Sequence, residues 1–142
     1  MLKKLPIALL VFFAACAAHA QSHTLTQLQG TARVLMVFAP QSDSVKFQRQ
    51  LELIAHHSFE LSLRNTVVVP VSSNTITEDY YGGESLPVTS LTEQSFVRTR
   101  FHVQLNDFAV VLLNEDGAEQ ARYTTPVDIH ELTARLDALT AR

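Results

Sequence analysis

Side chains that could carry chemistry are few in this sequence, and none forms a familiar catalytic or metal-binding motif. His56 and His57 are adjacent, so on a helix they point in different directions and suit a single metal ion poorly. His102 and His130 stand alone, and the sequence leaves open whether they meet in space. Ser42 could act as a nucleophile only beside a base, and a place at the start of a helix explains it more simply.

The first twenty residues predict export. Lys3 and Lys4 precede an apolar run at residues 5–15, and Ala18-His19-Ala20 places small residues at the two positions that a signal peptidase reads. The run is too short to span a membrane as a helix. We therefore predict a signal peptide at residues 1–20, cleavage after Ala20, and a periplasmic or secreted domain at residues 21–142.

Cys16, the only cysteine, offers an alternative. Phe13-Ala14-Ala15-Cys16 partly resembles a bacterial lipoprotein box, in which acylation of the cysteine would anchor the protein to a membrane. A membrane is an expected partner only in that case. Under the main interpretation Cys16 leaves with the signal peptide, so the mature chain holds no thiol for a disulfide or for catalysis.

The composition indicates one ordinary globular domain. With 142 residues and 46% hydrophobic content, the chain has room for one core and little more. Removing Lys3 and Lys4 changes the formal net charge from −3 to −5, and no basic run remains. Nucleic acid is therefore not an expected partner.

The strand around which the rest is organised is an unbroken apolar stretch at residues 33–39, closed by Pro40. A strand that is apolar at consecutive positions is covered on both faces, as at the centre of a sheet. Ser42 or Asp43 can cap the helix that follows. We expect that helix to end near residues 64–65, because its apolar face recurs at Phe47, Leu51, Ile54, Ser58 and Leu61.

Two shorter segments flank this unit. Residues 24–30 form a lead-in that turns Leu25 and Leu28 toward the sheet edge. Residues 66–72 are rich in β-branched side chains and predict a second strand, parallel to the first. Proline has no amide hydrogen to donate to a neighbour, so we expect this strand near an edge of the sheet, or Pro70 at a point where no hydrogen bond is required.

A long loop and a short helix come next. Residues 73–87 have no periodicity and carry Tyr80, Tyr81, Gly82 and Gly83. Two aromatics beside two glycines could close over a ligand or a protein partner, although tyrosines that cover the sheet edge are the simpler explanation. Ser90-Leu91-Thr92-Glu93 is a capping box, and it opens a helix that ends near residues 101–102 with Phe96 and Val97 inward.

The last third of the chain predicts a hairpin and a final helix. Strands at residues 108–113 and 119–124 flank a turn that ends in Gly117, which indicates an antiparallel pair. Thr125 and Pro126 are suited to the start of a helix. The buried stripe of that helix is expected at Ile129, Leu132, Leu136 and Leu139.

The predicted order is β-α-β-α-β-β-α. A parallel pair followed by an antiparallel hairpin, with helices on both faces, is the thioredoxin-like arrangement: an α/β three-layer sandwich around a mixed four-stranded sheet. On several stretches the chain also resembles the bacterial family catalogued as domain of unknown function 4174. These stretches are Arg33-Val-Leu-Met-Val-Phe-Ala-Pro40, the helix with Gln48 and Gln50, residues 67–69, Phe101-His102-Val103, residues 108–117 and Pro126-Val127. The resemblance covers roughly the whole mature chain and implies a thioredoxin-like fold; many members carry glycine-lysine where this chain has Asn114-Glu115.

The resemblance to redox-active thioredoxins ends at the active site. Aligning residues 37–39 with their equivalent strand places Ser42 and Val45 where the two cysteines would stand. Neither side chain can form a thiolate. The proline that faces those cysteines would precede the third strand, where this chain has Asp107-Phe108. The sequence therefore predicts neither disulfide exchange nor peroxidase activity of the peroxiredoxin type.

Two hypotheses follow for function. The first is an exported, non-catalytic binding or scaffold domain that needs no cofactor and meets an unidentified protein or small ligand in the cell envelope. The second is a hydrolase or metal-dependent enzyme assembled from the scattered serine, histidine and aspartate residues. The first is favoured because it requires no geometry that the sequence fails to show.

Overall fold

The computed structural model describes residues 23–73, 88 and 90–140. The predicted signal peptide, its cleavage site, Cys16 and the stretch from Tyr80 to Gly83 lie outside these residues. The described elements follow one another in this order: α1 (His23–Leu28), β1 (Arg33–Phe38), α2 (Val45–His56), α3 (Ser58–Leu63), β2 (Thr66–Val71), α4 (Leu91–Phe101), β3 (Ala109–Leu113), β4 (Glu119–Tyr123) and α5 (Ile129–Thr140). Across these elements, no helix has the length and apolar character needed to cross a membrane.

The four strands form one mixed sheet in the order β2-β1-β3-β4. β1 runs parallel to β2, with Arg33 opposite Thr66, and antiparallel to β3, with Val34 opposite Leu113. β3 and β4 form the predicted antiparallel hairpin. Gly117 closes its turn with a φ of +82°, a backbone conformation that glycine adopts without strain. The predicted α/β fold with a mixed four-stranded sheet is confirmed.

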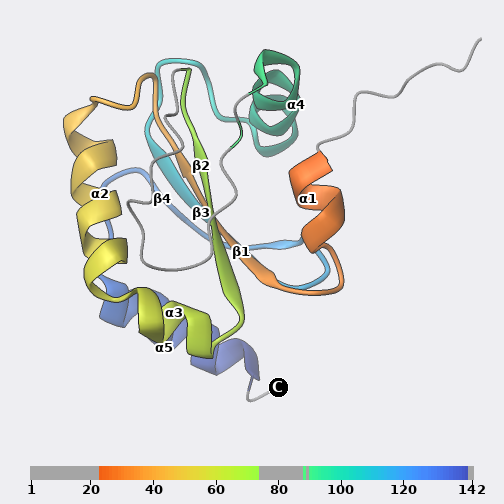
Figure 1. Cartoon of the computed structure of the whole chain (residues 1–142), viewed down its shortest axis with the longest axis vertical. Coiled ribbons are helices and arrows are strands. Elements are labelled where there is room, and N and C mark those ends of the chain that lie inside the picture. The colour runs from red at the N-terminus through yellow and green to blue at the C-terminus, as the bar shows by residue number, and fades with distance from the viewer. Residues whose placement is uncertain (1–22, 74–87, 89, 141–142) are drawn as a thin grey trace, which may run out of the picture.

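Helices cover both faces of this sheet (Figure 1), with α1 and α4 on one side and α2, α3 and α5 on the other. Alternate residues of β1 point to opposite faces, so Val34, Met36 and Phe38 pack with α1 and α4, whereas Leu35 and Val37 pack with α2 and α5. Residues 35–39 are fully buried. The apolar stretch is therefore an interior strand covered on both sides, as its composition predicted.

The second strand lies at an edge, as Pro70 predicted. The Pro70 carbonyl accepts a hydrogen bond from the Val88 amide at 3.0 Å, on the side away from β1. The amide and carbonyl of one strand residue point to the same side, so the missing amide hydrogen of Pro70 is not one that β1 requires.

The predicted long helix after β1 is wrong in two details. It is broken at His57 into α2 and α3, and its N-cap is Ser44 rather than Ser42 or Asp43, without a side-chain capping bond. Phe47, Ile54 and Leu61 are buried, as the single long helix also required. The break at His57 leaves these side chains facing the core. Periodicity alone therefore could not show the break.

Three other helix ends also correct or confirm the sequence prediction. The segment predicted as a lead-in is a helix, α1, which buries Leu25 and Leu28 in the core. The Thr24 amide donates a hydrogen bond to Glu93 Oε1 at 2.9 Å, which links α1 to α4. Ser90 is confirmed as the N-cap of α4, since its Oγ accepts from the Glu93 amide. The last helix begins at Ile129, where Asp128 Oδ1 accepts from the His130 amide at 2.7 Å. Thr125 and Pro126 precede it without starting it.

A buried glutamine joins α2 to the segment before α5. Gln50 is fully buried, and its Nε2 donates to the Val127 carbonyl at 3.2 Å while its Oε1 accepts from the Val127 amide at 2.7 Å. Both backbone polar groups of one buried residue are thus satisfied by one side chain. Gln50 therefore fixes the connection from β4 to α5 against the helix layer.

Candidate functional site

The carboxyl end of β1 and the start of α2 lie beside the segment that leads into β3. Ser42 is half-buried in the turn after β1, and Val45 is 85% exposed at the first position of α2. The Lys46 ammonium lies 5.9 Å from the centre of the Phe108 ring, which precedes β3. The described residues contain no cis peptide bond. Ser42 and Val45 therefore lie at the end of a parallel strand, where open α/β sheets usually hold their chemistry.

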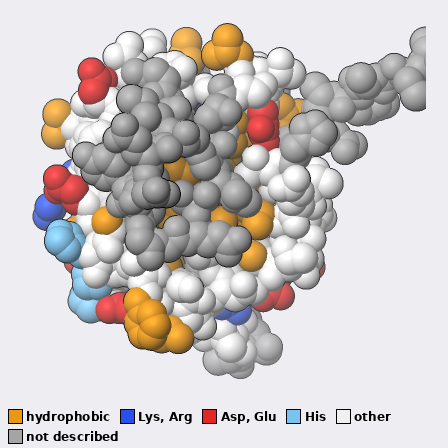
Figure 2. Space-filling model, viewed as in Figure 1, with side chains coloured by type: hydrophobic (Ala, Val, Ile, Leu, Met, Phe, Trp, Pro, Cys, Tyr) orange, Lys and Arg blue, Asp and Glu red, His pale blue; other side chains and the backbone are white. Residues whose placement is uncertain are grey.

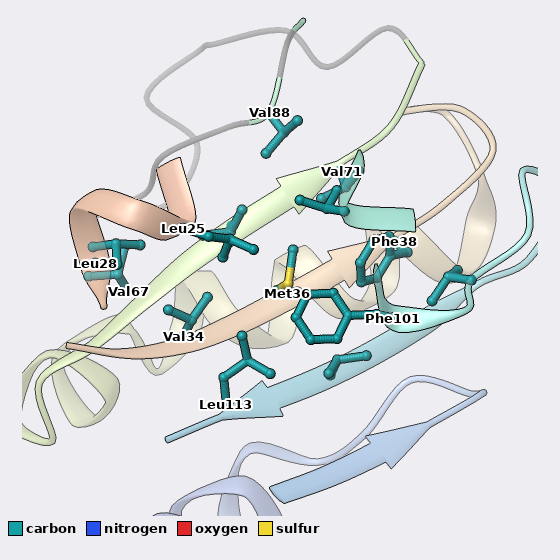
Figure 3. Packing of buried hydrophobic residues seen from close by; sticks show 14 of the residues in the cluster. Leu25, Leu28, Val34, Met36, Phe38, Val67, Val71, Val88, Phe101 and Leu113 are labelled. Carbon is teal, nitrogen blue, oxygen red and sulfur yellow. The ribbon is translucent and has the colours of Figure 1, made fainter. Parts of the chain in front are cut away.

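Sulfur is confined to the core of this domain. Residues 21–142 contain no cysteine and one methionine, Met36. Met36 is fully buried on the face of β1 that α1 and α4 cover. Figure 3 shows its sulfur among Leu25, Val34 and Phe101, within the apolar cluster. No sulfur atom of these residues therefore reaches the turn that carries Ser42.

The histidines separate into two places. The rings of His57 and His130 lie edge to face with their centres 5.4 Å apart, and His57 Nδ1 is 3.2 Å from Glu60 Oε1. His56 is exposed. In Figure 2 the pale blue of histidine lies at the lower left, over α2 and α3. His102 stands apart at the end of α4.

These positions do not assemble a hydrolytic or metal centre. Ser42 precedes α2 and His57 follows it, so the twelve residues of the helix separate them by about 18 Å at 1.5 Å per residue. Within residues 23–73, 88 and 90–140, no group of three or more histidine, cysteine, aspartate or glutamate side chains could hold a metal ion. The sequence did not predict that His57 and His130 meet, because 73 residues separate them.

A groove of about 570 Å³ opens beside α4. One wall is a stripe of α4 and the other is the segment after that helix, with Ser73 beyond the end of β2. The lining residues are Ser73, Leu91, Gln94, Ser95, Arg98, Thr99, His102, Val103, Gln104 and Leu105. Leu91 and Leu105 are 73% and 62% exposed, so large apolar side chains stand at the rim. Such a concave, largely apolar surface with a few polar groups is typical of a ligand site.

Arg98 is the unusual residue in this groove, because it is a cation that is 7% exposed. Its Nη2 donates to the Ala39 carbonyl at 2.6 Å and its Nη1 to the Gln104 carbonyl at 2.9 Å. Its carbon Cζ also lies 5.7 Å from the centre of the Phe38 ring. Arg98 therefore ties α4 to the carboxyl end of β1, directly before the turn that carries Ser42.

The charge of Arg98 is not neutralised by the residues that hold it. Both accepting groups are uncharged carbonyls, and Nε is buried without a hydrogen-bond partner. Burial lowers the pKa of Arg98, and the charge of nearby Asp107 opposes that shift. No carboxylate of the described residues forms an ion pair with Arg98. A buried guanidinium without a counter-ion is costly in free energy.

His102 adds a second irregularity to the same groove. It caps the C-terminus of α4 with a φ of +54°, a left-handed conformation in which glycine or asparagine is usual. Its side chain is exposed and lines the groove. Strained residues of this kind gather at functional sites, so the groove has two features that packing alone does not explain.

The sequence analysis did not predict a binding site at this groove. A signal was present, because Gln94, Val97, Arg98 and Phe101 follow the spacing of one helix face. Gln94 and Arg98 are therefore polar residues at inward positions, and both are buried. The prediction for Tyr80, Tyr81, Gly82 and Gly83 falls outside the described residues and stays a prediction.

The sheet order, the helices on both faces and the position of residues 40–45 define a thioredoxin-like α/β protein. Solved structures of peroxiredoxins share this fold. A reduced 2-Cys peroxiredoxin of Plasmodium vivax is 18% identical with a TM-score of 0.66, over 82% of this chain and 82% of that one. AhpC of Enterococcus faecalis is 15% identical with a TM-score of 0.65, over 82% and 78%, and AhpC of Mycobacterium tuberculosis is 11% identical with a TM-score of 0.61, over 81% and 77%. At these identities the likeness establishes the fold alone.

The particular family is given by sequence. Residues 24–142 match the family described as Domain of unknown function (DUF4174), and the chain belongs to it. No curated protein matches the chain.

Proposed function

We propose that this protein is an exported binding domain with a thioredoxin-like fold and without thiol redox chemistry. The observation that carries the proposal is the location of sulfur: residues 21–142 hold no cysteine, and their single methionine is fully buried. Disulfide exchange and thiol-based peroxide reduction both need an accessible thiolate. The surface at the end of β1 therefore remains available for binding.

The binding surface that we favour is the groove beside α4. It touches the carboxyl end of β1 through the hydrogen bond from Arg98 to the Ala39 carbonyl. Ligands of α/β proteins commonly occupy the crevice outside the carboxyl ends of the strands. Ser42 and Val45, which we take as the positions of the lost cysteines, lie a few residues further along the chain.

Export supports the same proposal. The basic start, the apolar run and the small residues before Gln21 predict a signal peptide that is removed after Ala20. An unidentified protein or small ligand of the cell envelope is then the expected partner, and the membrane is a partner only if Cys16 is acylated.

A double cysteine variant tests the assignment of the lost positions. In Ser42→Cys/Val45→Cys the two thiols stand three residues apart at a helix start, a separation that permits a disulfide of ordinary geometry. We expect one intrachain disulfide and measurable reduction of insulin disulfides, against none for the unmodified chain. Reduction by the unmodified chain would refute the proposal, and a variant that stays fully reduced under air would refute the assignment of Ser42 and Val45.

A metal-dependent enzyme is the second candidate, and the pair of His57 and His130 is the observation that favours it. Glu60 contacts His57 Nδ1, as a carboxylate often does behind a metal-binding histidine. Two histidines fall short of the three protein ligands of catalytic zinc sites. Elemental analysis of purified protein tests this candidate: stoichiometric zinc or copper that disappears in His130→Ala would favour the enzyme, and metal-free protein would count against it.

A further inference from the structure

The groove beside α4 contains a charge that its own walls do not balance. Arg98 has five N–H groups, of which one on Nη1 and one on Nη2 bind backbone carbonyls. Nε binds nothing and is buried. The residue lines the groove through the small part of its surface that remains exposed.

A purely structural role accounts for only part of this arrangement. The two carbonyl contacts tether α4 to Ala39 and Gln104, and an uncharged donor could make such contacts without the cost of burying a cation. After these two contacts each terminal nitrogen of Arg98 keeps one N–H, and a guanidinium N–H forms a strong charge-assisted hydrogen bond with a carboxylate. The unbalanced charge, rather than the tether, is therefore the feature that calls for a ligand.

The other walls of the groove indicate the rest of the ligand. Leu91 and Leu105 are exposed at the rim, and Val103 is buried beneath it. Hydroxyl and amide groups of Ser95, Thr99 and Gln104 line the same space. An apolar body of several carbon atoms would cover the leucines, and its anionic end would meet the guanidinium.

We propose that this groove binds a small amphipathic carboxylate, with Arg98 as the counter-ion of the carboxylate and Leu91 and Leu105 as contacts of the apolar body. The inference rests on the proposed binding function and names its ligand class. A free fatty-acid-like carboxylate and the C-terminal carboxylate of a peptide share this chemistry. The experiment distinguishes these two sources.

The test is a calorimetric titration of purified residues 21–142 with four probes: hexanoate, hexanamide, the tripeptide Gly-Leu-Val and its C-terminal amide. We expect an acid to bind at least about tenfold more tightly than its amide, as a charge-assisted hydrogen bond implies. Preference for hexanoate or for the tripeptide acid identifies the source of the carboxylate. Equal binding of acid and amide, or half-saturation weaker than about 10 mM for every probe, overturns the inference.

Two variants assign the effect to the groove. Arg98→Met should reduce the ratio of acid to amide affinity to about one, because the counter-ion is removed. Leu105→Glu keeps the tethers of Arg98 and places a carboxylate at the rim, so it should weaken acid binding about tenfold with an unchanged melting temperature. It answers the question even if Arg98→Met fails to fold.

The matched control is Leu63→Glu, the same substitution at a leucine of similar exposure on α3, which lines no part of the groove. This control should bind the acid as the unmodified chain does. Acid binding that survives in Leu105→Glu, or that falls equally in Leu63→Glu, contradicts the site. These outcomes do not affect the proposal of a redox-inactive domain. That proposal fails only if the unmodified chain reduces insulin disulfides or consumes hydrogen peroxide.

Discussion

Replacing Gln50 by leucine should be among the most destabilising single changes in this domain. Gln50 is fully buried, and its side chain satisfies both the amide and the carbonyl of Val127, which is 4% exposed. Leucine has a similar volume, so the substitution leaves two buried backbone groups unpaired without opening a large cavity. Each unpaired group costs about 1–3 kcal/mol, which gives about 2–6 kcal/mol for the pair.

Urea unfolding of residues 21–142, followed by circular dichroism, measures this loss. Since single domains are stable by about 5–15 kcal/mol, the Gln50→Leu midpoint should fall steeply while the slope of the transition stays the same. Gln48→Leu is the matched control on the same helix. Gln48 is exposed and its side chain donates to the Ser42 carbonyl at the surface, so its substitution should change stability by no more than about 0.5 kcal/mol. A Gln50→Leu variant as stable as this control would refute the role assigned to the Gln50–Val127 contact.

Three further predictions concern processing, strain and acid stability. Mass spectrometry of the exported protein should show a chain that begins at Gln21, and Cys16→Ser should leave its fractionation unchanged; a lipid-modified Cys16 as the first residue would contradict this. His102→Gly should raise the free energy of unfolding by about 1 kcal/mol, because it removes a left-handed non-glycine residue, and should weaken carboxylate binding in the groove. An equal or lower urea midpoint would contradict the strain at His102. Hydrogen bonds from Arg122 lower the pKa of Glu119 below its ordinary value of 4.5, so this contact stabilises the fold above pH 4.5 and is lost as the pH falls through the lowered pKa. Glu119→Gln should therefore flatten the acid limb of a plot of urea midpoint against pH, and an unchanged limb would argue against the contact.

The sequence predicted the sheet well because its strongest signals are also the most global ones. Consecutive apolar residues at 34–39 can be satisfied only by cover on both faces, and β1 has that cover. Pro70 at the edge and Gly117 in the hairpin turn follow from backbone chemistry that few other positions tolerate. Ser90 was correctly predicted to cap α4 because its contact with the Glu93 amide is local.

The errors lie where tertiary contacts decide the local structure. α1 has six residues, too few to be stable alone, and it is held by burial of Leu25 and by the bond from Thr24 to Glu93. The break at His57 leaves the inward face of α2 and α3 intact, so periodicity does not reveal it. α5 starts at Ile129 and not near Thr125, because the Asp128 side chain accepts the hydrogen bond that caps the helix.

The candidate site was harder to predict than the fold for the same reason. Arg98 is held in the groove by a hydrogen bond to the carbonyl of Ala39, 59 residues earlier in the chain, and the sequence does not show that contact. His57 and His130 meet only because α5 packs beside the α2–α3 junction. Only the inward spacing of Gln94 and Arg98 in the helical pattern could have pointed to the groove, and that spacing says where a side chain lies rather than what it binds.

The most direct test of the central claim is the rate of hydrogen peroxide consumption by purified residues 21–142, measured beside a peroxiredoxin at equal concentration. We expect a rate equal to that of buffer, because the only sulfur in these residues is the buried thioether of Met36. Catalytic consumption of peroxide that is lost in Ser42→Ala would contradict it.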